Sequence, residues 1–142
     1  MKKYLLDTNV ISEIIKPHPD NNVLTWLGNK REQSLFLSAI TIGELAKGIA
    51  ALADDQKKDR LLYWLETEIT HRFQERILPF DTQSALLWGE WNGKSGRRGV
   101  HYTLLDSQIA AIAVRFGCVL VTRNAKDVDG LPVEHLNPWI ES

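Results

Sequence analysis

The chain of 142 residues contains one cysteine, Cys118, and therefore cannot form a disulfide within itself. This cysteine stands beside the apolar residues 119–121, which predicts a buried structural thiol rather than a reactive one. No apolar run approaches the roughly 18 residues that a membrane helix needs, and the first residues lack the apolar segment of a secretion signal. We therefore expect a cytoplasmic protein with no membrane partner.

The chain also lacks a large excess of charge of either sign. Its 17 Lys and Arg residues nearly balance its 18 Asp and Glu residues, which leaves a formal net charge of −1. Such a chain has no global attraction to nucleic acid, so any binding of that kind must depend on local clusters of charge. The four histidines are scattered, and neither a His-x3-His nor a Cys-x2-Cys spacing offers a zinc site.

Short apolar segments alternate with helical patterns along the whole chain. Segments of this length between helices indicate a parallel sheet covered on both faces. We therefore predict one three-layer α/β/α domain over residues 1–142, with a central parallel sheet of four or five strands. The expected strands are residues 3–6, 34–38, 76–80, 118–122 and, less regular, 133–136. The expected helices begin near residues 9, 21 or 22, 41, 56, 82 and 103, whereas the glycines of residues 93–99 predict a loop.

Three acidic residues stand where strands give way to helices. Asp7 directly follows the first strand, and Glu44 and Asp106 each open a helix. Because open α/β sheets bind ligands at the carboxyl ends of their strands, the right-handed connections can bring these acids into one crevice. Thr122 ends the fourth predicted strand, Asn124 follows it, and both should face the same crevice.

A shared crevice would place the three carboxylates close together. Two carboxylates roughly 5 Å apart repel by about 3 kcal/mol at an effective dielectric constant near 20. A hard divalent cation such as Mg²⁺ or Mn²⁺, which prefers oxygen ligands, would offset that repulsion. Asn124 could supply an amide to orient water or a ligand. Asp127, three residues further on, is an alternative fourth acid.

Each acid also has a purely structural interpretation. Thr41-x-x-Glu44 fits a capping box, and Thr103-x-x-Asp106 could begin its helix in the same way. Asp7 could likewise cap the helix that follows the first strand. On this alternative the acids satisfy backbone amides and hold no ligand.

Four blocks of sequence, in this order, resemble the successive motifs of PIN-domain ribonucleases. The strongest likeness is to the VapC and FitB toxins of bacterial type II toxin–antitoxin pairs. The blocks are residues 5–13 (LLDTNVISE), 37–45 (LSAITIGEL), 105–111 (LDSQIAA) and 120–124 (LVTRN), with further similarity at residues 23–27, 76–81 and 137–139. The matching stretches run from residue 4 to residue 139.

The resemblance implies Mg²⁺- or Mn²⁺-dependent hydrolysis of phosphodiester bonds in RNA. On this basis Asp7 and Asp106 match the metal-binding aspartates, and Glu44 matches the acid that completes the metal site. Many members place a fourth acid where this chain has Asn124, so we expect three acids and an amide to form the catalytic set. Asp127 remains the other candidate for the fourth position.

The same resemblance implies partners. RNA, single-stranded or in loops, is the expected substrate, because A-form duplex hides its base edges. A homodimer is expected, together with an antitoxin that blocks the cleft with a basic side chain and alone contacts operator DNA. Residues that could bind the RNA are Thr8, Arg123 and the basic residues of the expected glycine-rich loop, Lys94, Arg97 and Arg98.

Two other functions compete with this interpretation. An aspartyl phosphatase would place a second acid two residues after Asp7, where this chain has Asn9. A catalytically silent PIN-like module would bind RNA or a protein partner and use the acids only as helix caps. Trp88 and Trp91 lie three residues apart on one helix, and we expect them to pack in the core or a dimer interface rather than to stack on RNA bases.

Overall fold

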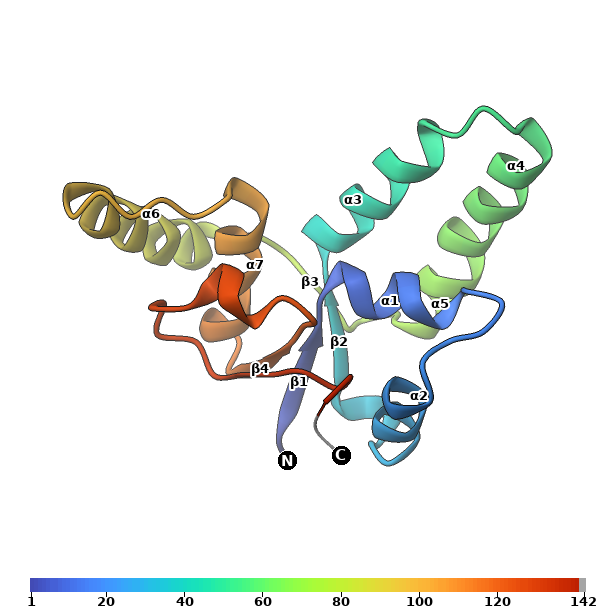
Figure 1. Cartoon of the computed structure of the whole chain (residues 1–142), viewed down its shortest axis with the longest axis horizontal. Coiled ribbons are helices and arrows are strands. Elements are labelled where there is room, and N and C mark those ends of the chain that lie inside the picture. Colours follow the sequence, from blue (N-terminus) through green and yellow to red (C-terminus); the bar gives the residue numbers. More distant parts are fainter. Residues whose placement is uncertain (141–142) are drawn as a thin grey trace.

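A parallel five-stranded sheet in the order β3-β2-β1-β4-β5 forms the centre of the computed structural model, which describes residues 1–140 (Figure 1). Short apolar segments supply all five strands, as the sequence predicts. The first strand has the predicted bounds, and the other four are somewhat shorter than expected. Their bounds are β1 Lys3–Leu6, β2 Leu35–Ser38, β3 Ile77–Leu78, β4 Cys118–Val121 and β5 His135–Leu136.

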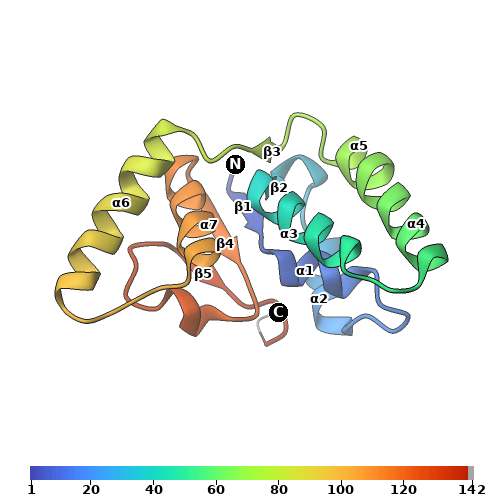
Figure 2. The ribbon, with the colours of Figure 1, turned by 90° about the horizontal axis from the view of Figure 1, so that it is seen from above.

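Helices cover both faces of the sheet, which confirms the three-layer α/β/α prediction. Helices α1 to α5 lie on one side, and α6 and α7 lie on the other (Figure 2). None of the helices within residues 1–140 is long and apolar enough to cross a membrane. The bounds are α1 Thr8–Ile14, α2 Asn21–Gly28, α3 Ala39–Ala50, α4 Asp55–Tyr63, α5 Thr70–Arg72, α6 Thr82–Arg97 and α7 Leu104–Arg115, with a π-helical segment at Trp64–Ile69 and 3₁₀ turns at Glu32–Ser34 and Ala125–Val128.

Alternation along the strands builds a separate core on each face. Leu6 packs with α1, α2 and α3, whereas its neighbour Leu5 packs with α7 on the opposite face. Cys118 belongs to this second core, where burial raises the pKa of its thiol to about 11. The prediction of a buried structural cysteine is therefore confirmed.

The strand order fixes where a ligand crevice can form. From β1 the chain moves outward on one side to β2 and β3, and it then returns to place β4 on the other side of β1. The order thus reverses between β1 and β4, and such a switch point opens a crevice at the carboxyl ends of the two strands. Asp7 stands there, and its backbone N–H donates to the carbonyl oxygen of Val121 at 2.9 Å.

Two predicted helix starts are wrong. Asp20, rather than Asn21 or Asn22, caps α2, and its carboxylate accepts the backbone N–H groups of residues 22 and 23. The third helix begins at Ala39, because the hydroxyl of Ser38 accepts the backbone N–H of Thr41 at 3.0 Å. In both cases the side chain of a residue with extended backbone accepts the first free backbone N–H groups and so decides where the helix starts.

The predicted glycine-rich loop at residues 93–99 is also wrong, because α6 continues to Arg97. Contacts with α7 outweigh the low helix propensity of glycine in this stretch. Trp88 donates its indole N–H to the hydroxyl of Ser107 at 2.9 Å, and Trp91 packs against the second core. Ser95, one turn further on, is buried. Trp91 thus packs against the core, which is one of the two roles expected for the pair, and Trp88 is tied to α7 through Ser107.

We predict opposite effects of alanine at two glycines of this region. Gly93 lies within α6 with open space around its Cα, so Gly93→Ala should raise the free energy of unfolding by about 0.5–1 kcal/mol. Gly99 ends the helix with a φ of +76°, where a side chain is strained, so Gly99→Ala should lower it by about 1 kcal/mol or more. Urea unfolding of both variants measures these effects. An equal loss in both would contradict the helical extension.

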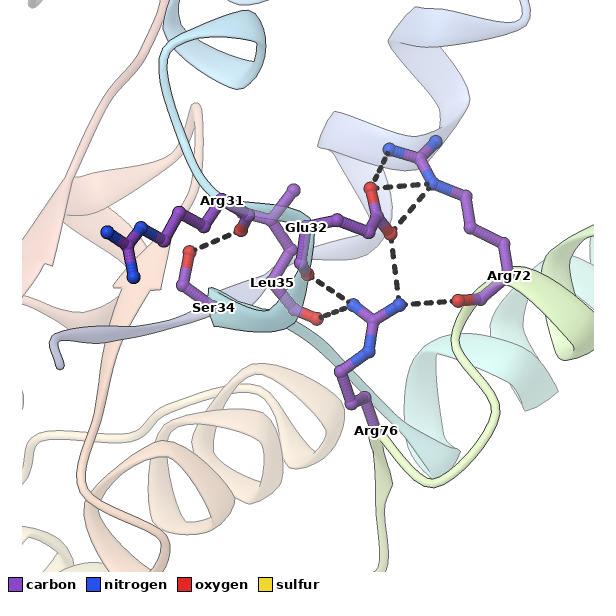
Figure 3. A network of polar contacts seen from close by, with 6 residues as sticks. All are labelled: Arg31, Glu32, Ser34, Leu35, Arg72 and Arg76. Carbon is purple, nitrogen blue, oxygen red and sulfur yellow. Dashed lines mark hydrogen bonds and ion pairs between the residues drawn. The ribbon is translucent and has the colours of Figure 1, made fainter.

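A buried arginine ties the start of β2 to the start of β3 (Figure 3). One nitrogen of Arg76 donates to the carbonyl oxygens of Glu32 and Leu35, and the other donates to the Glu32 carboxylate at 3.0 Å and to the carbonyl oxygen of Arg72. The Arg76 side chain is only 16% exposed. It lies at the amino ends of these strands, away from the crevice, so we assign it a structural role.

Candidate active site

A cleft of about 360 Å³ opens at the switch point, and the residues predicted from the sequence as a catalytic set lie along it: Asp7, Glu44, Asp106 and Asn124. Arg123 and Thr8 line the same cleft. Asp127 does not line it and lies instead in the 3₁₀ turn after β4. The three basic residues of α6 line a separate hollow at the end of that helix: Lys94, Arg97 and Arg98.

Asp7 is held firmly between strand and helix. Its carboxylate accepts the backbone N–H of Thr8 and the hydroxyl of Thr122, both at 2.8 Å. Burial raises the pKa of Asp7 to about 6, the two hydrogen bonds oppose that shift, and the negative charges of Asp106 and Glu44 add to it. Asp7 is also the N-cap of α1, so its structural interpretation is correct in part. A cap alone, however, does not require two further acids nearby.

Glu44 ends a chain of hydroxyl groups that starts inside the sheet. The Thr8 hydroxyl donates to Glu44 at 2.7 Å, because an ionised carboxylate can only accept. The Thr41 hydroxyl lies 3.1 Å from that of Thr8, and the Ser38 hydroxyl lies 3.2 Å from that of Thr41. If the Ser38 hydroxyl donates to that of Thr41, Thr41 can donate to Thr8, and Thr8 can donate to Glu44. Every hydroxyl in the series then has an acceptor. The chain fixes Glu44 on the cleft wall.

Asp106 and Asn124 complete the rim from α7 and from the loop after β4. The Thr103 hydroxyl donates to the Asp106 carboxylate. The backbone N–H of Asn124 donates to the Thr122 hydroxyl at 3.1 Å, and this same hydroxyl donates to Asp7. The side-chain amide of Asn124 makes no hydrogen bond to any part of the chain that the structure describes, so it is free to meet a ligand.

The capping-box interpretation of two acids does not hold. Ser38, not Thr41, is the N-cap of α3, and the carboxylate of Glu44 is engaged by the hydroxyl of Thr8. Thr103 is the N-cap of α7, but its side chain binds no backbone amide there. Neither acid therefore closes a capping box, and both are oriented by hydroxyl groups toward the cleft.

Sequence reasoning missed the part of the cleft that α1 and the chain end supply. The additional lining residues are Asn9, Ser12, Glu13, Lys16 and Trp139. Four of them could have been found, because residues 9, 12, 13 and 16 recur at the spacing of one helix face. Trp139 gave no such signal, since it reaches the cleft only through the pairing of β5 with β4.

The donor set suits a hard cation that keeps part of its water shell. Three carboxylates and an amide offer only oxygen ligands, as Mg²⁺ and Mn²⁺ prefer. Between residues 1 and 140, no three His, Cys, Asp or Glu side chains come close enough to form a ready-made metal cage. Mg²⁺ is usually bound by one or two carboxylates with several waters retained, so the set fits such an ion.

Comparisons with known proteins identify the family of the chain. The model of the PIN domain family matches residues 4–129. The toxin FitB of Neisseria gonorrhoeae is 37% identical over 135 residues, which cover 95% of this chain and 97% of that protein. The VapC ribonuclease Y4jK of Sinorhizobium fredii is 34% identical over the same length, covering 95% and 96%.

Solved structures show the same fold. The crystal structure of FitAcB from Neisseria gonorrhoeae matches with a TM-score of 0.91 at 36% identity, covering 97% of this chain and 99% of that chain. DNA-bound VapBC from Salmonella typhimurium matches with a TM-score of 0.80 at 26% identity, covering 97% and 99%. A family model that spans nearly the whole chain, relatives above one-third identity and a shared fold lead to one conclusion: the chain belongs to the PIN-domain family.

Proposed function

We propose that the chain is a metal-dependent endoribonuclease that serves as the toxin of a type II toxin–antitoxin pair. The observation that carries the proposal is the convergence of Asp7, Glu44 and Asp106 on one cleft at the switch point of the sheet. Burial raises the pKa of Asp7, and the charges of the other two acids add to that effect. A cleft built in this way favours a divalent cation. The named relatives include a VapC ribonuclease and the toxin FitB, which points to RNA as the substrate.

Each acid has a distinct part in the proposed reaction. Asp7 and Asp106 would hold Mg²⁺ or Mn²⁺, which, when bound, polarises the scissile phosphate and lowers the pKa of water. Glu44, oriented by the Thr8 hydroxyl, would accept the proton of the attacking water. Asn124 would orient that water or a phosphate oxygen through its free amide.

Asn124 should matter more to catalysis than Asp127. Asn124→Ala should lower kcat by roughly tenfold to a hundredfold, as is usual for residues that orient ligands of a metal site. Asp127→Ala should change it by less than about threefold, because Asp127 does not line the cleft. Steady-state cleavage of a fluorescent RNA oligonucleotide measures both values. A larger loss at Asp127 would assign the fourth position to that residue instead.

An antitoxin is the expected partner, because solved relatives include the toxin–antitoxin complexes FitAB and VapBC bound to DNA. An apolar groove adjoins the acid cleft and shares Thr8, Ser12 and Glu44 with it. A peptide in this groove could place a basic side chain among the acids and compete with the cation. Operator DNA would then be contacted through the antitoxin, and the toxin itself would be a homodimer.

Expression of the chain alone in bacteria tests the proposal. Growth should stop within a few generations, and the Asp106→Asn variant, expressed at the same level, should permit growth. Purified protein with Mn²⁺ should cleave RNA, and sequencing of the new ends should reveal the target. A wild-type protein that is harmless at high expression and inert towards RNA would instead indicate a catalytically silent module.

A further inference from the structure

Two basic side chains, here called the cationic wall, line the same cleft as its acids. Lys16, just after α1, and Arg123, just after β4, both line the cleft, and the Trp139 ring contacts the arginine. Phosphate groups of a nucleic acid are repelled by three carboxylates, so a strand entering this cleft needs positive charge near its path. The wall supplies that charge from the chain itself.

Arg123 is held in place by its backbone and by an aromatic ring. Its N–H donates to Asn9 at 3.3 Å, and its carbonyl oxygen accepts from Asn137 at 3.2 Å. The guanidinium carbon lies 5.2 Å from the centre of the Trp139 ring, a distance typical of a cation–π contact. Within residues 1–140 the guanidinium makes no hydrogen bond or ion pair. The N–H donors of the guanidinium are thus held at the cleft and are available to bind a ligand.

Lys16 is oriented by a buried carboxylate. Glu13 is almost fully buried, accepts the ammonium of Lys16 at 2.8 Å and accepts the backbone N–H of Asp20 at 2.9 Å. The Lys16 side chain nevertheless remains 53% exposed. Two cations and one carboxylate leave this wall with a net charge of +1. Glu13 therefore fixes the ammonium group without cancelling the positive charge of the wall.

We propose that Arg123 and Lys16 bind the phosphate adjacent to the scissile one and so set the path of the RNA strand through the cleft. This inference rests on the proposed function, in which the acids receive the scissile phosphate. Arginine suits the role because its fork can bind two phosphate oxygens at once. The basic end of α6 is a poorer candidate, because its residues line a separate hollow that none of the three cleft acids shares.

Binding of RNA without cleavage tests the proposal directly. The Asp7→Asn protein serves as the parent, in EDTA, with a fluorescent single-stranded RNA of mixed sequence and fluorescence anisotropy at several salt concentrations. Arg123→Gln and Lys16→Gln should each weaken binding at low salt by roughly fivefold or more and reduce the slope of log affinity against log salt by about 0.7. The matched controls Arg60→Gln and Lys57→Gln, both exposed on α4, should leave the slope unchanged.

Three results would overturn the proposal. The first is a parent that binds RNA with no salt dependence, or not at all. The second is an unchanged slope in both cleft variants, confirmed as folded by thermal melting. The third is a loss of antitoxin binding with RNA binding intact, which would assign the wall to the protein partner. If Lys16→Gln fails to fold, Arg123→Gln decides alone, because within residues 1–140 its guanidinium makes no hydrogen bond or ion pair and contacts the Trp139 ring by its face.

The outcome is separable from that of the proposed function. A wild-type protein that binds RNA with the expected slope but never cleaves it with Mn²⁺ refutes the nuclease and leaves the phosphate wall standing. A wild-type protein that cleaves RNA, with an Arg123→Gln variant of unchanged KM, refutes the wall alone. Arg123→Lys adds a further check, since a single ammonium should recover only part of the lost affinity.

Discussion

Replacing Asp7 with asparagine is expected to stop RNA cleavage and, at pH 7.5, to make the metal-free protein more stable. Cleavage should fall by roughly a thousandfold or more, because a ligand of the proposed cation is lost. The gain in stability has a separate origin. Asp7 has a pKa of about 6 in the folded chain, so its ionised form is disfavoured there relative to the unfolded chain.

The sign of the effect follows from proton linkage. Below about pH 4, Asp7 is protonated in both states, and its ionisation costs no stability. Between pH 4 and 6 the unfolded chain releases its proton first, so stability falls as pH rises. Above pH 6 the full penalty applies, about 3 kcal/mol for a shift from 3.8 to about 6.

Asparagine removes that penalty but not without cost. Its oxygen can still accept from Thr8, whereas its amide nitrogen would face the Thr122 hydroxyl, which already accepts from Asn9 and Asn124. The loss of one hydrogen bond should cancel about 1 kcal/mol of the stability gained by removing the charge. Urea unfolding in EDTA should thus show the variant about 2 kcal/mol more stable at pH 7.5 and no more stable than wild type at pH 4. A variant that is less stable at both pH values would contradict the penalty on the buried Asp7 carboxylate.

Replacing Arg76 with methionine is expected to cause the largest loss of stability without loss of catalytic function. Methionine keeps most of the apolar stem but leaves the carbonyl oxygens of Glu32, Leu35 and Arg72 without their donor. Hydrogen bonds from a charged donor contribute roughly 1.5–3 kcal/mol each, and water can replace part of them. We expect a loss of about 3 kcal/mol, or roughly 10 °C in Tm.

Arg72→Met is the matched control. Arg72 meets the same carboxylate of Glu32 at 3.0 Å, but both side chains are at least 40% exposed, so this pair should contribute no more than about 1 kcal/mol. Differential scanning calorimetry of the two variants gives the comparison. At 25 °C the Arg76→Met variant should retain its kcat for RNA, because the arginine lies at the opposite end of the sheet. Equal Tm values for both variants would show that the buried carbonyl contacts contribute little.

The sequence allowed a better prediction of the acid side of the cleft than of its basic side. Asp7, Glu44 and Asp106 each follow a strand or open a helix, and parallel strands must bring such positions to one edge. Trp139 carries no comparable signal, and Lys16 carries only its spacing on one face of a predicted helix, because the places of both depend on how the end of α1 and the segment after β5 pack. The same limit explains α6, where contacts of Trp88 and Ser95 with the rest of the fold override the glycines.

Helix starts showed a more local limit. Several polar residues near a start can cap it, and the choice depends on which backbone is extended. Ser38 has φ −99° and ψ 153° and captures the N–H of Thr41, which no pattern of residue types distinguishes from a start at Thr41 itself. Because Ser38 is the N-cap, the Thr41 hydroxyl can join the series of hydroxyl groups that orients Glu44. A helix start predicted two residues too late therefore missed this contact.

Cleavage of a single-stranded RNA by the purified protein, with its metal removed and restored, shows whether the three acids act through a bound cation. We expect cleavage with Mn²⁺ or Mg²⁺, none in EDTA, recovery when the metal is returned, and none at any metal concentration for the Asp106→Asn variant. Cleavage that persists in EDTA, or that survives in the Asp106→Asn variant, would contradict a reaction carried out by this carboxylate cluster and its cation.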